Sequence, residues 1–103
     1  MVIRTISVWL MASAFVGMLF GEEVTEGEKL FALRVKPLFA EKCNACHGDD
    51  PEDIEGDFDM RSRESILKGG EYFETDVLHP GKGEESYLYL TTTRTEEDYE
   101  MPP

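Results

Sequence analysis

The five residues from 43 to 47, Cys-Asn-Ala-Cys-His, constrain this chain more than any other feature of its sequence. One turn of backbone separates the two thiols, and the histidine follows the second thiol directly. This spacing is typical of the covalent attachment of a c-type haem, in which two cysteines bond to one edge of the porphyrin. A histidine in the next position can then bind the iron from the proximal side. We therefore expect Cys43 and Cys46 to carry one haem c, with His47 as an iron ligand.

Three other interpretations of the cysteines stay open at this point. A redox-active dithiol of the thioredoxin type needs a βαβ context, and no strand-rich pattern precedes Cys43. A structural zinc ion needs four ligands, and only His47 and the distant His79 are available to join the two sulfurs. A plain disulfide would close a loop so short that it would constrain the unfolded chain little. Haem attachment is the interpretation that uses both thiols and the adjacent imidazole.

The N-terminal residues 1–21 have the pattern of a secretory signal peptide. Arg4 supplies a positive charge, and the almost wholly apolar run 6–20 has about fifteen residues, which is shorter than the ~20 needed to span a bilayer. Gly21 marks a candidate cleavage boundary, although Leu19 is larger than the residue usually found three positions before the cut. We expect a cleaved signal peptide, with a retained N-terminal anchor as the alternative. Contact with a membrane is expected only in the second case.

The remaining residues, 22–103, are expected to form one exported domain, in the periplasm or an equivalent compartment of the cell envelope. Export agrees with haem c, which is attached on the far side of the bacterial cytoplasmic membrane. A domain of about this size has a marginal hydrophobic core, and a porphyrin would add a large apolar body around which short helices can pack.

The charge of the chain restricts its partners. Ten basic residues face 22 acidic ones, for a formal net charge of −12, and loss of Arg4 with the signal would make it −13. Nucleic acid is excluded as a partner because its phosphates would be repelled. The acidic surface favours a redox partner with a basic docking surface, steered by the negative field.

Three helices are predicted from apolar spacing and from helix-ending residues. They are residues 26–42, a short helix capped by Ser62 or Ser65 and stopped by Gly69-Gly70, and residues 84–92, with Tyr87, Leu88 and Leu90 facing inward. Pro37 should cause a kink or a short break near Lys36. The segment 48–59 is rich in turn-forming residues and is expected to be a loop.

The second iron ligand is expected to be a methionine, because histidine and methionine together are common in electron-transfer cytochromes. Of the five methionines, only Met60 and Met101 lie beyond the signal. Met101 precedes two prolines, which favour an extended loop able to present a thioether. Met60 lies in an apolar-spaced segment and fits a core position better. We expect Met101 to be the ligand, with His79 and Met60 as the alternatives.

Several segments together resemble the planctomycete-type cytochrome c domain, over about residues 31–103. They are Val35-Lys36-Pro37-Leu38-Phe39, Cys43-Asn44-Ala45-Cys46-His47-Gly48, residues 62–70, Pro80-Gly81 with Ser86-Tyr87-Leu88, and Met101-Pro102-Pro103. The resemblance implies an all-α, class I cytochrome c fold of short helices around one covalently attached haem. It implies Cys43 and Cys46 as attachment points, with His47 and Met101 as the metal ligands.

One departure from that family concerns the C-terminus. Family members continue into a further helix, which contains a tryptophan and packs across the N-terminal helix. The sequence stops at Pro103, and its tryptophan, Trp9, lies in the signal. We therefore expect a haem domain that is truncated at its C-terminus, with low stability and a distal ligand that exchanges easily.

The expected function is one-electron transfer rather than catalysis, since no acid–base or nucleophilic constellation is visible. Two alternatives stay open: the chain is the haem module of a larger secreted enzyme, or its open distal site binds a small ligand. Three basic residues are candidate partners of the haem propionates or members of ordinary surface ion pairs: Arg61, Arg63 and Lys68.

Overall fold

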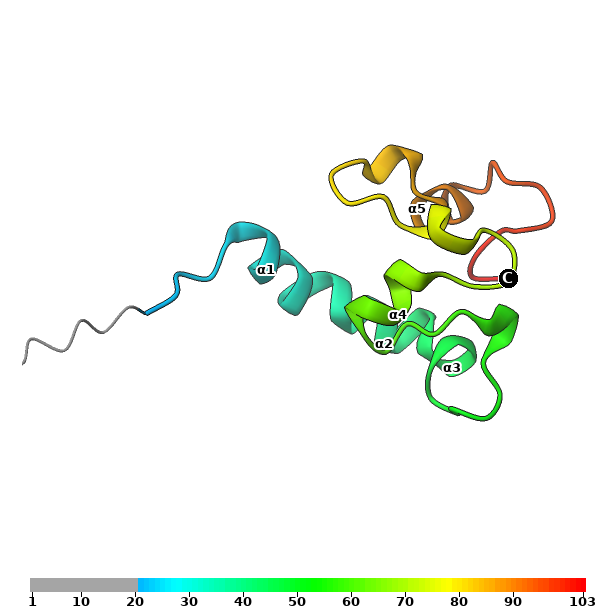
Figure 1. The fold of residues 1–103 in the computed structure, drawn as a ribbon, viewed down its shortest axis with the longest axis horizontal. Helices are drawn as coiled ribbons and strands as arrows, with labels where there is room; N and C mark the ends of the chain where they lie inside the picture. The colour runs from blue at the N-terminus through cyan, green and yellow to red at the C-terminus, as the bar shows by residue number, and fades with distance from the viewer. Residues whose placement is uncertain (1–20) are drawn as a thin grey trace, which may run out of the picture.

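The computed structural model describes residues 21–103, and this part of the chain consists of helices and loops without strands (Figure 1). The all-α prediction is therefore confirmed. The predicted signal or anchor lies, apart from Gly21, outside the described residues. Within residues 21–103, no helix is both long enough and apolar enough to cross a membrane. In chain order, the helical elements are α1 (Glu26–Leu30), η1 (Phe31–Val35), α2 (Lys36–Lys42), α3 (Asn44–His47), η2 (Glu55–Asp57), α4 (Arg63–Lys68), η3 (Glu74–Val77), η4 (Gly83–Glu85), α5 (Tyr87–Leu90) and η5 (Thr91–Thr93).

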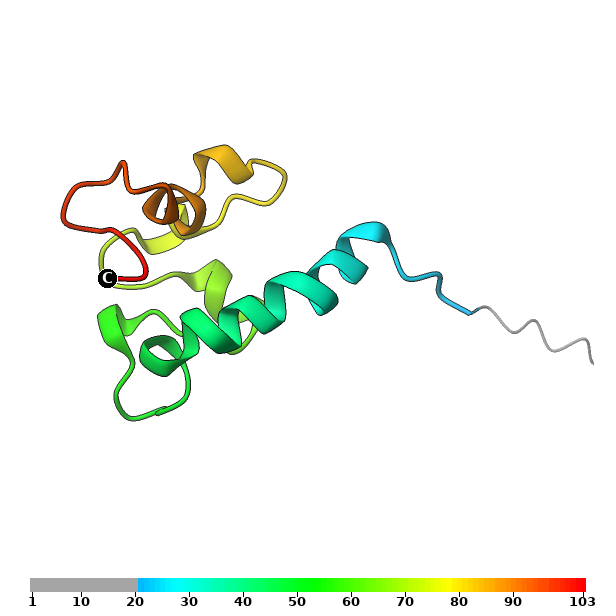
Figure 2. The ribbon, with the colours of Figure 1, turned by 180° about the vertical axis from the view of Figure 1, so that it is seen from behind.

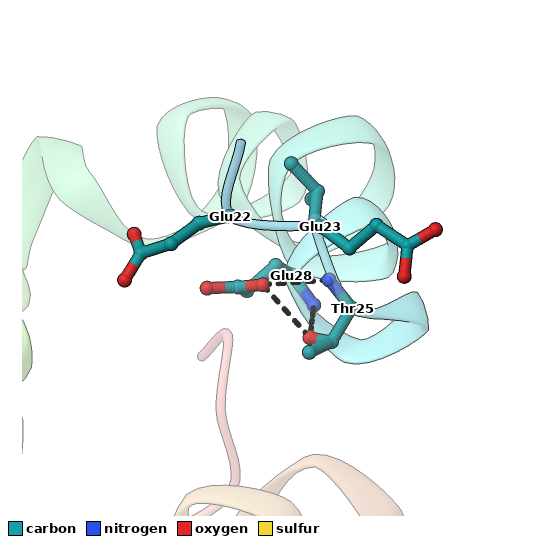
Figure 3. Close-up of a pocket in the computed structure, with 5 residues that line it drawn as sticks. Glu22, Glu23, Thr25 and Glu28 are labelled. Atoms are coloured by element: carbon teal, nitrogen blue, oxygen red, sulfur yellow. Dashed lines mark hydrogen bonds between the residues drawn. The ribbon is translucent and has the colours of Figure 1, made fainter. Parts of the chain in front are cut away.

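Helix α1 begins with a capping box formed by Thr25 and Glu28 (Figure 3). The backbone N–H of Glu28 donates to Thr25 Oγ1 at 3.2 Å, and the backbone N–H of Thr25 donates to the Glu28 carboxylate at 2.7 Å. These two bonds satisfy amide groups that the first turn of a helix leaves without partners. The backbone N–H and the hydroxyl of Thr25 both donate to the Glu28 carboxylate, and they lower its pKa because they stabilise the charged form.

The first helix runs from Glu26 to Lys42 as predicted, with α1, η1 and α2 following one another directly (Figure 2). The predicted kink or break near Lys36 takes the form of a π-helical segment, η1, just before Pro37. There the Lys36 N–H donates to the carbonyl of Phe31, five residues earlier. Proline cannot donate this bond and its ring crowds the preceding turn, so a wider turn lets the helix continue.

The second predicted helix is confirmed as α4, with Ser62 as its N-cap. Ser65 is not the cap but its partner, because each serine hydroxyl accepts a hydrogen bond from the backbone N–H of the other serine. Gly69 ends the helix with φ of +78° and ψ of −158°, a conformation that is open almost only to glycine.

The third predicted helix, residues 84–92, is wrong as one element. Ser86 has an extended conformation (φ −85°, ψ 127°) and separates η4 from the four-residue helix α5. Its hydroxyl accepts from the His79 N–H at 2.9 Å and donates to the Lys82 carbonyl at 3.1 Å. These bonds hold the 79–86 loop, and they explain why Ser86 is 1% exposed. The inward-facing residues expected from this segment, Tyr87, Leu88 and Leu90, are half-buried.

The buried side chains of the described chain lie between Met60 and Thr91. The buried apolar residues are Met60, Ile66 and Val77, and the buried polar ones are Ser86 and Thr91. The first helix, by contrast, extends from the body as a rod (Figure 2) and has no buried residue. This small core leaves a cavity beside α3.

Candidate functional site

The backbone turn at the end of α2 places the two thiols and the imidazole close together. Cys43 leaves the helical conformation (φ −123°, ψ −42°), and α3 begins at the next residue. The N–H groups of Cys46 and His47 both donate to the Cys43 carbonyl, at 3.2 and 3.0 Å. Cys43 is half-buried and Cys46 exposed, and both are free thiols. This single turn brings all three side chains to the wall of one cavity.

The imidazole of His47 is held in a defined orientation by the segment 58–60. Its Nδ1 lies 3.0 Å from the carbonyl oxygen of Phe58, and its ring packs edge-to-face on the Phe58 ring at a centroid distance of 5.4 Å. The N–H of Met60 donates to the His47 carbonyl at 2.8 Å. A carbonyl partner requires Nδ1 to carry the proton, so Nε2 has the free lone pair that a metal ligand needs.

The cavity has a volume of about 550 Å³ and its lining is mostly apolar. Pockets that hold cofactors have volumes of roughly 300–1,000 Å³ and similar walls. Cys43, Cys46, His47 and Met101 all line it, so the structure brings together the four site residues predicted from the sequence. Met101 belongs to the C-terminal segment. In Figure 1 this segment lies between α5 and the region around α3.

The two alternative iron ligands differ in position. His79 does not line the cavity; its Nε2 lies 3.2 Å from Asp76 Oδ1, in a surface pair. Met60 does line the cavity, but it is 6% exposed and its backbone is bonded to His47. Its burial agrees with the core role that the sequence favoured.

The basic residues considered for the haem propionates lie elsewhere. Arg61, Arg63 and Lys68 do not line the cavity. Arg61 forms a surface ion pair with Asp59, with Nη2 2.7 Å from Oδ2. The basic residue that does line the cavity is Lys42, which the sequence did not single out. Three carboxylates share the lining with it: Glu55, Glu71 and Asp98.

The environment of the thiols argues against two of the other interpretations. Burial raises the pKa of the Cys43 thiol, whereas the thiols of reactive dithiol motifs have a lowered pKa. Among residues 21–103, no three His, Cys, Asp or Glu side chains are grouped so that they would hold a metal ion. A four-ligand zinc site therefore has no support in the part of the chain that the structure describes.

Besides Lys42, two further parts of the site were missed by sequence reasoning. The Phe58 carbonyl that orients His47 is a backbone group, and no residue pattern identifies it. The second is a cluster of four aromatic rings along one wall of the cavity: Tyr72, Phe73, Tyr87 and Tyr99. Only Tyr87 was expected to face inward. The other three rings lie in turns and loops outside the helices, where no periodicity marks the inward face.

The described residues fit a covalently held haem c. The donor set consists of two adjacent thiols, one imidazole with a free Nε2 and a methionine, around an apolar cavity of suitable volume.

Comparison with known proteins also indicates a cytochrome c domain. The family model described as Planctomycete cytochrome C matches residues 43–103, which contain all four predicted site residues. No curated protein and no solved structure gives a significant match. Haem binding and electron transfer are the general properties that this match indicates. The resemblance seen in the sequence is confirmed, and the chain belongs to the planctomycete cytochrome c family.

Proposed function

We propose that this protein is a one-electron carrier with a single haem c and His/Met axial ligation. One observation carries the proposal: Cys43, Cys46, His47 and Met101 line the same cavity although Met101 is distant from the others in sequence. A haem bound there would supply the ferric/ferrous couple. The chain would attach and orient the group and tune its potential, and the proposal assigns no catalytic residue.

Each of the four residues has a distinct part in this proposal. The Cys43 and Cys46 thiols would form thioethers at the edge of the porphyrin, which makes the group permanent. His47 would bind iron through Nε2, since Nδ1 is occupied by the Phe58 carbonyl. That hydrogen bond fixes the orientation of the ring. Met101 would bind from the distal side, where a thioether raises the reduction potential.

The carboxylates of the cavity oppose the effect of the methionine on the potential. Glu55, Glu71 and Asp98 line the cavity with Lys42 as a basic residue beside them. Negative charge near the iron stabilises the ferric state, which has one more positive charge. We therefore expect each Glu→Gln replacement at the cavity to raise the reduction potential.

Haem attachment is tested by producing the protein, with its leader, in a bacterium that has a c-haem assembly system. The expected product keeps its red colour in the protein fraction after acid–acetone extraction, and neither cysteine reacts with an alkylating reagent. Replacing both Cys43 and Cys46 with alanine should remove the covalent pigment. Pigment that moves entirely into the organic layer from the unaltered protein would refute the proposal.

Axial ligation is tested with methionine and histidine variants of the same holoprotein. Met101→Ala should abolish the thioether-to-iron absorption band at the red end of the ferric spectrum. Met60→Leu and His79→Ala are the matched controls and should keep the band. Loss of the band in Met60→Leu but not in Met101→Ala would assign the ligand to Met60 instead.

A distinct function would follow if Met101 does not bind the iron. Met101 is 38% exposed, so solvent and small molecules can reach its side chain. Carbon monoxide added to the reduced protein distinguishes the two cases. A six-coordinate carrier should bind it slowly and weakly, whereas an open site for small ligands should bind it at once.

The partner and the compartment also belong to this proposal. An exported, acidic carrier should exchange electrons faster with a basic redox protein than with an acidic one. The rate with the basic partner should fall as salt is added, because the Debye length shrinks from ~30 Å at 0.01 M to ~10 Å at 0.1 M. Equal rates with both partners at low salt would remove the basic docking surface from the proposal.

A further inference from the structure

The chain from residue 94 to 103 has little that holds it to the rest of the protein. Four of its residues are acidic, Glu96, Glu97, Asp98 and Glu100, and mutual repulsion opposes packing on an acidic body. Within it, Tyr99 is the one aromatic residue. The position of Met101 therefore depends on a small number of contacts.

One set of contacts passes through the Tyr99 ring. This ring packs edge-to-face on Phe73, with centroids 5.0 Å apart at an interplanar angle of 66°. On another side it packs edge-to-face on Tyr72 at 5.6 Å and 61°. Phe73 in turn stacks on Tyr87, the first residue of α5, at 4.0 Å and 8°. Tyr99 is thus joined to α5 through Phe73.

A second contact joins the same loop to the other end of α5. The Met101 N–H donates to the carbonyl of Thr91 at 3.0 Å. Thr91 is 7% exposed, and its hydroxyl donates to the Tyr87 carbonyl at 2.8 Å. The contacts therefore close a circuit: Tyr99 to Phe73, Phe73 to Tyr87, Tyr87 to Thr91, and Thr91 to Met101. Tyr99 and Met101, separated only by Glu100, are thus joined to opposite ends of α5. Tyr99 is joined through Phe73, and Met101 is joined through Thr91.

We propose that Tyr99 is a positioning residue that clamps the Met101 loop over the cavity through Phe73 and Tyr72. A loop held by the Met101–Thr91 hydrogen bond alone could still rotate about that bond. The contacts of the Tyr99 ring with Phe73 and Tyr72 prevent this rotation. Among the described residues, no hydrogen bond involves the Tyr99 hydroxyl, so the contacts of Tyr99 are made by its aromatic ring. This inference rests on the proposed ligation by Met101 and goes beyond it by naming what holds that ligand in place.

The test measures imidazole binding to the oxidised holoprotein, because imidazole competes with the distal ligand for iron. Tyr99→Ala removes two aromatic contacts and should raise the imidazole affinity about tenfold. The same variant should weaken the thioether-to-iron band and lower the reduction potential. Tyr99→Phe keeps the ring and should match the unaltered protein in all three measurements.

Tyr89→Ala is the matched control. Tyr89 is 52% exposed, lies on α5 and does not line the cavity, so its loss should leave imidazole binding unchanged. Tyr72→Ala removes one of the two contacts and should raise the affinity about threefold. Because Tyr72 is 62% exposed, this variant also decides the question if Tyr99→Ala fails to accumulate with haem.

The outcomes separate this inference from the function it rests on. If Met101→Ala loses the band while Tyr99→Ala and Tyr72→Ala behave like Tyr89→Ala, the clamp is refuted and His/Met ligation stands. If Met101→Ala keeps the band, the ligation fails, and the clamp fails with it because it has no ligand to position. A graded rise in imidazole affinity from Tyr72→Ala to Tyr99→Ala, with the Tyr99→Phe protein unchanged, supports the clamp.

Discussion

The first helix and the segment from Met60 to Thr91 are stabilised in opposite ways. The helix, Glu26 to Lys42, has no buried residue, and its apolar side chains are largely exposed, Leu33 at 72%. Its order comes from local features, namely the capping box, its backbone hydrogen bonds and the wide turn before Pro37. The segment 60–91 has helices of only three to six residues but contains all the buried side chains of residues 21–103. Short helices are not stable alone, so tertiary contacts must hold them.

This contrast shows which part of the molecule the site depends on. His47 is oriented by Phe58, and Met101 is held by Thr91; both supports lie in or beside the segment 60–91. The first helix contributes the turn that presents Cys43. Substitutions in the segment 60–91 should therefore disturb the positions of His47 and Met101, whereas substitutions on the exposed side of the first helix should not.

The largest effect is expected at Gly69, with Gly81 as the matched control. Both have φ of +78°, but a Cβ on Gly69 would clash with the Glu74 carbonyl oxygen, whereas a Cβ on Gly81 would meet nothing within 4 Å. Gly81→Ala should cost about 1 kcal/mol of unfolding free energy from backbone strain alone. Gly69→Ala adds a backbone clash and should cost more than about 3 kcal/mol. Denaturation of the two holoproteins measures both values, and similar values would contradict this account.

The next largest effect compares two aliphatic residues. Ile66 is 6% exposed in the core, while Leu33 projects from the first helix. Ile66→Ala should cost about 2–4 kcal/mol, because it removes buried methyl groups and leaves a cavity. Leu33→Ala should change the stability by less than about 0.5 kcal/mol. Comparable losses would show that the exposed side of the helix is covered in solution.

The same division explains how much of the fold and site could be predicted. The extent of the first helix, the serine cap of α4 and its stop at Gly69 follow from local sequence signals, and the structure agrees with each. The predicted helix 84–92 was wrong because the Ser86 side chain bonds back to the loop at His79 and Lys82, and apolar periodicity does not reveal such a contact. Likewise, Cys43, Cys46 and His47 form a local motif, while the Phe58 carbonyl and the Tyr99 ring reach the site only through the fold.

A smaller effect is expected from the two capping boxes, which begin α1 and α4. Ser62→Ala removes the cap of α4, which carries Ile66, and should lower the unfolding free energy by about 1 kcal/mol. Thr25→Ala should fray the end of the first helix with little change in the global transition, because no buried residue depends on it. Hydrogen exchange of the α1 amides should report that fraying. Equal losses of global stability would mean that the first helix unfolds together with the core.

The smallest effect concerns the pH dependence that comes from the surface pair Asp59 and Arg61. Hydrogen bonds from the Arg61 side chain and backbone, with a smaller contribution from its charge, lower the pKa of Asp59 from 3.8 to about 2. A carboxyl with a lowered pKa in the folded state stabilises the protein above its unfolded pKa, and this stabilisation is lost as pH falls from about 4 to about 2.

Because solvent screens this surface pair, the change in stability should be small, and the titration itself is the sharper measurement. In an NMR titration of the Asp59 carboxyl, Arg61→Gln should move its pKa back towards 3.8. Ligand binding at the iron should stay the same, since Arg61 does not line the cavity. A shift in imidazole affinity would show instead that the pair, which flanks Met60, helps to hold the segment 58–60 against His47.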